Sequence, residues 1–267
     1  ETGTHYTDIT GELSVLEACH ALDAEAKERG IVILPAVGFD VVPTDCLALK
    51  LKQALPGATT LELAIGGGRA SAGTTKTGYL GLSLGSAVRE NGRIRRVPLA
   101  HKQMRVPFRD KERHVVSVPW GDISTAYVTT GIGNITTYMA LPGRLAFWAR
   151  VARPFLPMTA WPPVRAWLER RADRVQGPDE RELADGVTQV WGRVTDDAAG
   201  APAVEGQAVT ATLVTVNAYR LTALAAVEAT QRLVDGDFPP GAHTPAGLFG
   251  ADFIDTFERT DVRMEEA

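Results

Sequence analysis

The chain has 267 residues, of which 45% are hydrophobic and 22% are charged, so at roughly 150 residues per domain it forms one large or two small globular domains. Its 26 glycines and 16 prolines are too few for a low-complexity or fibrous protein. A formal net charge of -4 offers no overall basic surface, so nucleic acid is not an expected partner. Cys19 and Cys46 have no second Cys or His at a metal-ligand spacing. We therefore expect free buried thiols in a reducing compartment, and no metal site.

The first 55 residues alternate between strand and helix patterns. In chain order the predicted elements are a strand over 5–9, a helix over 11–30, a strand over 31–37 and a helix over 43–55. The continuous apolar run 31–37 is typical of a strand that is covered on both faces in a parallel sheet. Pro35 within it indicates an early end or a sheet edge. This part of the chain is predicted to be α/β.

From residue 59 onward, strand patterns dominate. The predicted strands are 59–65, 114–118, 123–130, 135–141, 186–196 and 206–215, and Asn91-Gly92 predicts a tight hairpin. The predicted helices are 71–87, 143–156, 161–174 and 217–234. The uncharged run 123–143 contains too many threonines and glycines for a membrane span, and is predicted as two strands around Gly131 to Asn134. Many strands with few helices between them indicate a mixed sheet.

The segment Gly38-Phe39-Asp40-Val41-Val42-Pro43-Thr44-Asp45 lies where the apolar strand meets the next helix. Ligands of open α/β sheets bind at the carboxyl ends of such strands, so Asp40 and Asp45 lie near a predicted site. From the residues alone, a structural role is favoured for both carboxylates. Asp45 would complement the helix dipole, and Asp40 would close a turn.

Four segments together carry a resemblance to a known family. They are Gly3-Thr4-His5-Tyr6-Thr7-Asp8-Ile9-Thr10-Gly11-Glu12, Gly38 to Asp45, Gly67-Gly68 with Ala72-Gly73-Thr74, and Thr244-Pro245-Ala246. Their order and spacing resemble those of the saccharopine dehydrogenase-like oxidoreductases, most closely the trans-acting enoyl reductase branch. The resemblance implies the end of a Rossmann-type cofactor domain over 1–55, a mixed-sheet α+β substrate domain over 56–216, and C-terminal helices over 217–267 that return to the cofactor domain.

The resemblance also implies an NAD(P)-dependent reaction, with NADP or NAD as cofactor. The implied cofactor-binding residues are Tyr6, Asp8, Gly38, Phe39 and Asp40. His5, Tyr6 and Asp40 are the candidate catalytic residues, because His and Tyr can donate a proton beside a nicotinamide. Family members begin with a strand and a glycine-rich turn that holds the cofactor pyrophosphate, and no counterpart precedes Glu1. We therefore expect the chain to correspond to the C-terminal two-thirds of an oxidoreductase, and not to bind NADPH with useful affinity by itself.

Gly66-Gly67-Gly68-Arg69-Ala70-Ser71 partly imitates a dinucleotide-binding turn, with Glu90 as its downstream acid. The match is weak because Ser71 replaces the third glycine and an Asn-Gly hairpin follows the helix. We expect these glycines to allow close backbone approach, with Thr74, Thr75 and Lys76 meeting an anionic or carbonyl group of the substrate. Simple packing of the helix on the sheet is the open alternative.

Residues 141–175 carry seven arginines against Glu169 and Asp173, a net charge of +5, which leaves -9 for the rest of the chain. Three of the five tryptophans lie in the same stretch. Its apolar residues Leu145, Trp148, Val151, Ala152 and Phe155 share one helical face. Aromatic residues opposite arginines are typical of a helix in a membrane interface, or of a lid over a lipid-like substrate. Amphipathic helices packed on the sheet or across a homodimer are the open alternative.

The resemblance implies an NAD(P)-dependent oxidoreductase that reduces an enoyl or carbonyl group, and the aromatic-rich segment 143–167 indicates an apolar or lipid-like small molecule as its substrate. One alternative is a non-catalytic lipid-binding or membrane-peripheral module on the same fold. Another is an amino-acid dehydrogenase of the saccharopine reductase type. We expect a cytoplasmic protein, with contact to a membrane surface through 143–174 as a further expectation.

Overall fold

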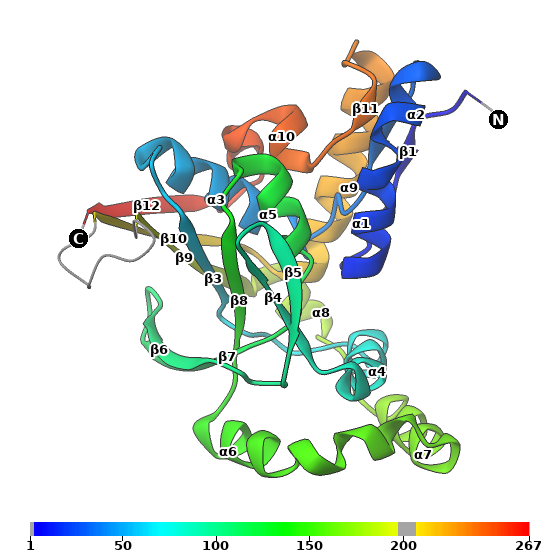
Figure 1. Cartoon of the computed structure of the whole chain (residues 1–267), viewed down its shortest axis with the longest axis vertical. Coiled ribbons are helices and arrows are strands. Elements are labelled where there is room, and N and C mark those ends of the chain that lie inside the picture. The colour runs from blue at the N-terminus through cyan, green and yellow to red at the C-terminus, as the bar shows by residue number, and fades with distance from the viewer. Residues whose placement is uncertain (1–2, 197–206, 267) are drawn as a thin grey trace.

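The computed structural model describes residues 3–196 and 207–266, which form two sheets surrounded by helices (Figure 1). The strands are β1 (Tyr6–Thr7), β2 (Val32–Leu34), β3 (Thr60–Ile65), β4 (Ser86–Glu90), β5 (Arg93–Val97), β6 (Gln103–Pro107), β7 (Glu112–Ser117), β8 (Asn134–Ala140), β9 (Val187–Thr195), β10 (Ala208–Val216), β11 (Gly241–Ala242) and β12 (Asp261–Glu266). The α-helices are α1 (Leu13–Ala21), α2 (Asp23–Glu28), α3 (Val42–Ala54), α4 (Ala72–Gly81), α5 (Asp122–Thr130), α6 (Gly143–Val151), α7 (Pro162–Ala172), α8 (Glu180–Asp185), α9 (Ala218–Asp235) and α10 (Pro245–Phe249). The 3-10 helices are η1 (Leu82–Leu84), η2 (Arg153–Ala160) and η3 (Ala251–Thr256).

The small sheet is parallel and has the order β1-β2-β11. The helices α1 and α2 connect β1 to β2, which is the strand–helix–strand alternation that the sequence predicts. Strand β2 ends at Leu34, immediately before Pro35, so the early end is confirmed, and β2 lies in the middle of the sheet. The third strand of the small sheet, β11, comes from the C-terminal part of the chain. Both ends of the sequence therefore build this sheet.

The large sheet is mixed, as predicted. Its main order is β12-β10-β9-β3-β8-β4-β5, with β7 also pairing with β8, and β6 pairing with β7. Strands β3 and β8 are parallel, whereas β9, β10 and β12 run antiparallel to their neighbours. The hairpin between β4 and β5 turns at Asn91 and Gly92, whose φ angles of 50° and 76° are those of a tight primed turn. The predicted hairpin is confirmed.

The predicted strand 123–130 is wrong, because these residues form the helix α5. Their many β-branched residues favour a strand locally, but Ile123 and Ala126 are buried at helical spacing. The helix ends at Gly131, which adopts a left-handed conformation with a φ of 70°. Tertiary burial therefore overrides the local preference for a strand.

Other elements differ in their bounds or were not predicted. The predicted helix 71–87 ends at Gly81 and is followed by a 3-10 turn and β4. Strands β6 and β12 and helix α8 were not predicted, and β12 lies within the segment for which only helices were expected. The first residue of the predicted strand 206–215 lies outside the described residues. Charged side chains alternate with apolar ones in β12, so its short apolar signal is weak.

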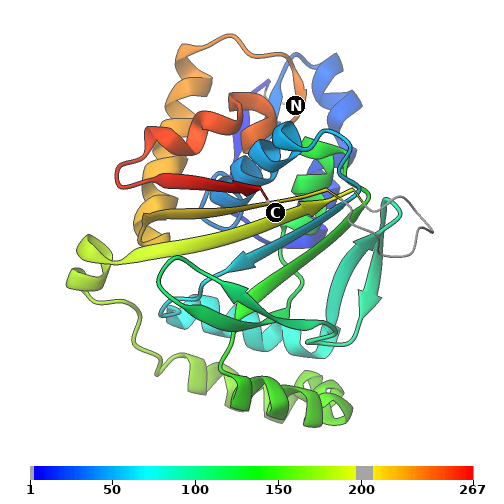
Figure 2. The same ribbon diagram turned by 90° about the vertical axis from the view of Figure 1, so that its left-hand side faces the viewer.

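The main core lies between one face of the large sheet and helices α3, α5, α9 and α10. Figure 2 shows α3 and α9 on one side of this sheet, and α4, α6 and α7 on the other. Residues of the small sheet belong to the same core, including Val32 and Leu34. The small sheet and the large sheet are therefore joined through shared packing around α3.

Gly192 of β9 allows α3 to approach the sheet closely. A Cβ atom at this position would lie 2.6 Å from Leu51 Cδ1 and 3.2 Å from Leu47 Cδ2. We expect Gly192→Ala to lower the free energy of unfolding by about 1–3 kcal/mol, because extra atoms in a packed core force side chains and backbone to shift. Chemical denaturation measures this effect. Gly78→Ala in α4 is the control, because apart from its chain neighbours and the backbone of its own helix no atom lies within 4 Å of the added Cβ. An equal loss in both variants would contradict the packing argument.

Helices α6 and α7, with η2 between them, form an arm (residues 143–174) at one end of the molecule (Figures 1 and 2). The two predicted helices of this region are confirmed, although 3-10 turns replace the end of the first. Among the described residues, no helix combines the length and the hydropathy that a membrane span needs.

Candidate functional site

The carboxyl ends of β1 and β2 are tied together by Asp8. Its carboxylate Oδ1 accepts hydrogen bonds from the backbone N–H groups of Ala36 (2.8 Å) and Thr10 (2.9 Å). Its backbone carbonyl accepts a third from the N–H of Val37 (2.8 Å). Ala36 has a φ of 60°, an uncommon conformation for a residue other than glycine, and these contacts hold it. Asp8 therefore fixes the loop that leads to Asp40.

Tyr6 adds to this arrangement. Its hydroxyl donates a hydrogen bond to Asp8 Oδ2 at 2.5 Å. This hydrogen bond, with some burial, raises the pKa of Tyr6 to about 12. The phenol therefore keeps its proton at neutral pH and directs it to Asp8.

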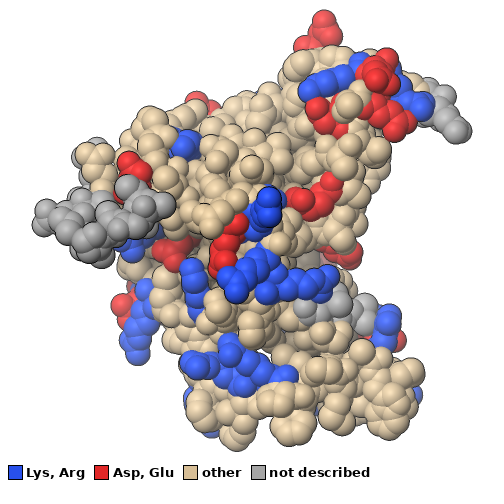
Figure 3. Space-filling model, in the orientation of Figure 1, with Lys and Arg blue, Asp and Glu red and all other residues tan. Residues whose placement is uncertain are grey.

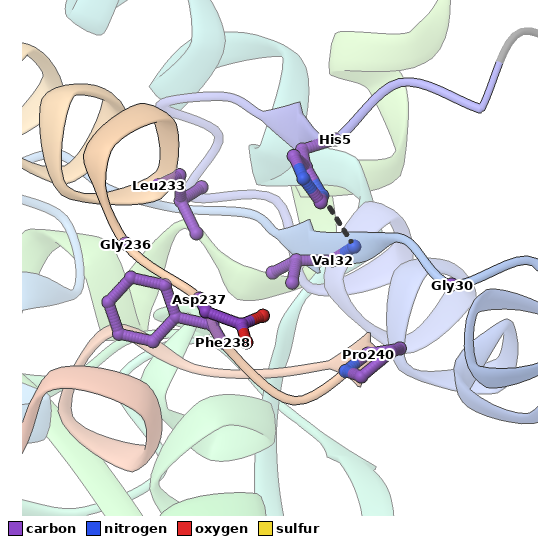
Figure 4. Close-up of a pocket in the computed structure, with 8 residues that line it drawn as sticks. All are labelled: His5, Gly30, Val32, Leu233, Gly236, Asp237, Phe238 and Pro240. Carbon is purple, nitrogen blue, oxygen red and sulfur yellow. Dashed lines mark hydrogen bonds between the residues drawn. The ribbon is translucent and has the colours of Figure 1, made fainter.

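His5 lies at the opposite end of the small sheet, because it precedes β1, whereas Asp40 follows β2 in a parallel pair. Its Nδ1 accepts a hydrogen bond from the N–H of Val32 at 3.0 Å (Figure 4). It borders a pocket of about 200 Å³, whose lining residues are His5, Gly30, Val32, Leu233, Gly236, Asp237, Phe238 and Pro240. The pocket lies at the amino ends of the strands, whereas ligands of open α/β sheets bind at the carboxyl ends. The structure thus does not bring His5 together with Asp40.

The Gly38-Phe39 segment packs closely against α9. A Cβ atom on Gly38 would lie 3.0 Å from Thr222 Cγ2 and 3.3 Å from Ile9 Cβ. The next residue, Phe39, donates its N–H to Thr222 Oγ1 at 3.1 Å. Glycine at position 38 therefore allows the loop and the helix to make this contact.

The carboxyl group of Asp40 is buried and has a raised pKa. Its Oδ2 lies against Gly11, where a Cβ atom would come within 2.4 Å. Its backbone carbonyl accepts a hydrogen bond from Trp120 Nε1 at 2.5 Å. Among the described residues, no hydrogen bond to the Asp40 carboxylate is found, and burial raises the pKa of Asp40 to about 6. Asp40 can therefore gain and release a proton near neutral pH, which is the property of a general acid or base.

Two further carboxyl groups are buried near the first turns of α3 and α5. Asp45 accepts hydrogen bonds from the N–H of Ala246 (2.8 Å) and the hydroxyl of Thr129 (2.5 Å), and burial raises its pKa to about 6. Asp122 is also fully buried, and within the described part of the chain neither of its carboxylate oxygens has a hydrogen-bond partner. Burial, with repulsion from Asp45 and Asp40, raises the pKa of Asp122 well above its ordinary value. The buried site of Asp122 therefore favours the protonated carboxyl over the ionised form.

The start of α4 is held by a tyrosine from α9. Tyr219 accepts a hydrogen bond from the N–H of Ser71 at 2.6 Å, and its hydroxyl lies 3.0 Å from Thr74 Oγ1. Ser71 also caps the helix by accepting from the N–H of Thr74. Thr75 lies next to Thr74 in the same first turn. Of the predicted substrate residues, Thr74 is thus the one that the structure links to α9.

Lys76 has a different partner from Thr74. Its Nζ lies 3.9 Å from a carboxylate oxygen of Asp173, which follows α7. The glycine loop from Gly66 to Ser71 is followed by α4 and then by β4. Strand β4 is antiparallel to β8, so the loop does not lead into a parallel strand. The loop therefore lacks the strand–helix–strand context of a dinucleotide-binding turn, in agreement with the weak sequence match.

Helix α9 connects the two predicted halves of the site. Tyr219 contacts the start of α4, and Thr222, one turn later, contacts Phe39. Sequence reasoning missed both residues, although their spacing of three places them on one helical face. The candidate site is therefore the region bounded by Asp40, Phe39, Thr74 and these two α9 residues.

Among residues 3–196 and 207–266, no group of three or more His, Cys, Asp or Glu side chains could hold a metal ion. Cys19 and Cys46 are free and buried, as predicted. Burial raises the pKa of Cys46 well above its ordinary value, so its thiol stays protonated and unreactive.

Neither the models of protein families nor the curated proteins include a match to this chain. Its structure is similar to apo saccharopine dehydrogenase (L-Glu forming) from Saccharomyces cerevisiae, with a TM-score of 0.55 at 12% sequence identity. The similarity covers 92% of this chain and 76% of the yeast protein. At this identity the likeness concerns the fold. The chain therefore has a saccharopine dehydrogenase-like α/β fold, with a Rossmann-type part and a further mixed-sheet α+β part, as the sequence predicts.

Proposed function

We propose that the chain contains the nicotinamide and substrate parts of an NAD(P)-dependent oxidoreductase, with Asp40 as its proton-exchanging group. The observation that carries this proposal is the Asp40 carboxyl, which lies after a central parallel strand and has a pKa raised to about 6. Ligands of open α/β sheets bind at this end of the strands. The similarity to a solved dehydrogenase supports the same reaction class.

The described residues fit one end of the cofactor better than the other. A pyrophosphate needs several free backbone N–H groups at a strand-to-helix turn. In the two such turns of the small sheet, intramolecular hydrogen bonds occupy the N–H groups of Thr10, Glu12, Ala36, Val37 and Phe39. These turns therefore suit the nicotinamide end, through Tyr6, Asp8, Gly38, Phe39 and Asp40. We propose that the pyrophosphate is held by residues other than these two turns.

When bound, the reduced nicotinamide supplies a hydride to the substrate. In the proposed reaction Asp40 donates the proton that balances this transfer, since a carboxyl with a pKa near 6 is partly protonated at neutral pH. Thr74 and Tyr219 present hydroxyl groups that can hydrogen-bond a substrate oxygen. Gly11 leaves space for the Asp40 carboxyl, which a larger residue would displace.

The charged groups near α4 favour a carbonyl or enoyl substrate over a dicarboxylic amino acid. Recognition of a dicarboxylate needs free cationic side chains. Arg69 pairs with Glu182 at 3.1 Å, and Lys76 faces Asp173. The structural likeness is equally consistent with an amino-acid dehydrogenase. Our preference for a carbonyl or enoyl substrate therefore rests on these ion pairs.

The test is a comparison of NADPH, NADH and reduced nicotinamide mononucleotide as ligands of the 267-residue chain. We expect all three to bind weakly, and NADPH to bind no more than about tenfold tighter than the mononucleotide, because five backbone N–H groups of the two turns are already engaged in intramolecular hydrogen bonds. Amide chemical shifts in NMR spectra measure the affinities and locate the contacts. The expected shifts centre on residues 38–40.

Two results would contradict this account in different ways. If the mononucleotide caused no shifts, or shifts around His5 and its pocket alone, the proposed nicotinamide site would be wrong. If NADPH bound more than about a hundredfold tighter than the mononucleotide, the chain would hold a pyrophosphate site that we have missed.

A further inference from the structure

The arm (residues 143–174) exposes an unusual number of large apolar side chains. Between 47% and 64% of the surface of each is accessible, and they are Leu145, Phe147, Trp148, Val151, Phe155, Met158, Trp161 and Trp167. Such a concentration of exposed large apolar side chains in one segment is uncommon in a protein that functions without a partner, and it indicates an interaction surface.

The exposed side chains are presented by a firmly attached element. Ala146 of α6 is buried against Ala100 and Val116. Arg153 donates hydrogen bonds to the carbonyl groups of Leu99 (2.8 Å) and Ala100 (2.5 Å). Helix α7 packs on α4 at the other end of the arm. The inner face of the arm is thus fixed, so its aromatic side chains remain on the outside.

The charge that accompanies these aromatic residues is positive. The two acids of the arm are engaged, since Glu169 pairs with Arg165 at 3.0 Å and Asp173 faces Lys76 of α4. Within the described residues, no ion pair or hydrogen bond of a side chain is found for Arg144, Arg150, Arg170 and Arg174. Figure 3 shows mainly blue and tan atoms at this end of the molecule.

We propose that the arm docks on the surface of a membrane that contains anionic lipid. Its three helical segments lie along one end of the molecule in both views, so a flat surface can contact all of them together (Figures 1 and 2). Aromatic side chains enter the interface between headgroups and acyl chains, and arginines bind the lipid phosphates. A symmetric contact between two arms would instead bring together two surfaces that each carry a net charge of +5. The proposal does not depend on the proposed activity.

The test is co-sedimentation of the 267-residue chain with vesicles of phosphatidylcholine, with and without about 30% phosphatidylserine. We expect binding to the anionic vesicles only. It should weaken by about tenfold or more when NaCl is raised from about 0.1 M to about 1 M, since the Debye length then falls from about 10 Å to about 3 Å. Lipids with brominated acyl chains should quench the fluorescence of the exposed tryptophans.

The double variant Trp148→Ala/Phe155→Ala should bind anionic vesicles at least about tenfold more weakly, with an unchanged melting temperature, because both side chains are mainly exposed. The control is Val227→Ala/Val234→Ala in α9, which truncates two apolar side chains outside the arm that are 71% and 74% exposed, and which should bind normally. Absence of binding to anionic vesicles, or equal binding by both variants, would overturn the proposal. So would a dimer in solution that the Trp148→Ala/Phe155→Ala variant dissociates, because a second copy would then cover the arm.

Discussion

Asp40→Asn is expected to lower nicotinamide-dependent turnover by about 100- to 10,000-fold, the range that removal of a positioned general acid or base produces. The substitution keeps the shape of the side chain and its contact with Gly11, but it removes the proton that the carboxyl exchanges. Turnover is measured as oxidation of NADPH or reduced nicotinamide mononucleotide with an enoyl or ketone substrate.

The pH dependence gives a second readout of the same residue. For reduction, Asp40 must be protonated, so the rate should fall as the pH rises through about 6, the pKa to which burial raises this carboxyl. In the Asp40→Asn variant, the rate should no longer decrease as the pH rises through about 6. Asp185→Asn is the control, since Asp185 is exposed in α8. An unchanged rate with an unchanged pH profile would leave Asp40 as a turn residue only.

Asp122→Asn is expected to raise the free energy of unfolding at pH 7 by more than the roughly 0.5 kcal/mol of an ordinary surface substitution, because the buried carboxyl disfavours its ionised form and asparagine carries no charge. Burial raises the pKa of Asp122 well above its ordinary value, so the folded chain keeps a proton that the unfolded chain releases above about pH 4. The stability contributed by this carboxyl therefore decreases as the pH rises from about 4 toward its folded pKa. Asparagine removes this cost and keeps the shape.

Urea denaturation at several pH values measures the effect. The gain in the Asp122→Asn variant should increase with pH, whereas Asp185→Asn should change stability by less than about 0.5 kcal/mol. Asp40 and Asp45, with pKa values raised to about 6, should still reduce stability between about pH 4 and 6 in both proteins. A variant that is less stable than the unaltered chain at every pH would show that Asp122 is ionised and partnered.

The sequence predicted much of the small sheet, because its signals are local. The apolar run before Pro35 and the Gly38-Phe39-Asp40 segment were correctly located at a strand-to-helix junction. The hairpin at Asn91-Gly92 was also correct, since that dipeptide favours the two positive φ angles of the turn. The strand predicted over 123–130 was wrong because the structure there depends on tertiary packing. Burial of one face stabilises the helix α5, which local propensities disfavour.

The candidate site was predicted less completely. Tyr219 and Thr222 reach Ser71 and Phe39 across more than 140 residues of sequence, and only tertiary packing reveals such contacts. The state of Asp122 likewise depends on burial, which no spacing rule detects. For the same reason, the sequence could not predict that Lys76 faces Asp173.

The most direct test of the central claim is an NMR titration of the side-chain carboxyl of Asp40, in the free chain and with reduced nicotinamide mononucleotide. The account predicts a pKa of about 6 in the free chain. It also predicts a further rise on addition of the mononucleotide, since the bound ring would exclude water from the carboxyl. Comparison with the Asp40→Asn variant assigns the signal and separates it from that of Asp45. An ordinary pKa that the mononucleotide does not change would contradict the assignment of Asp40 as the proton-exchanging group.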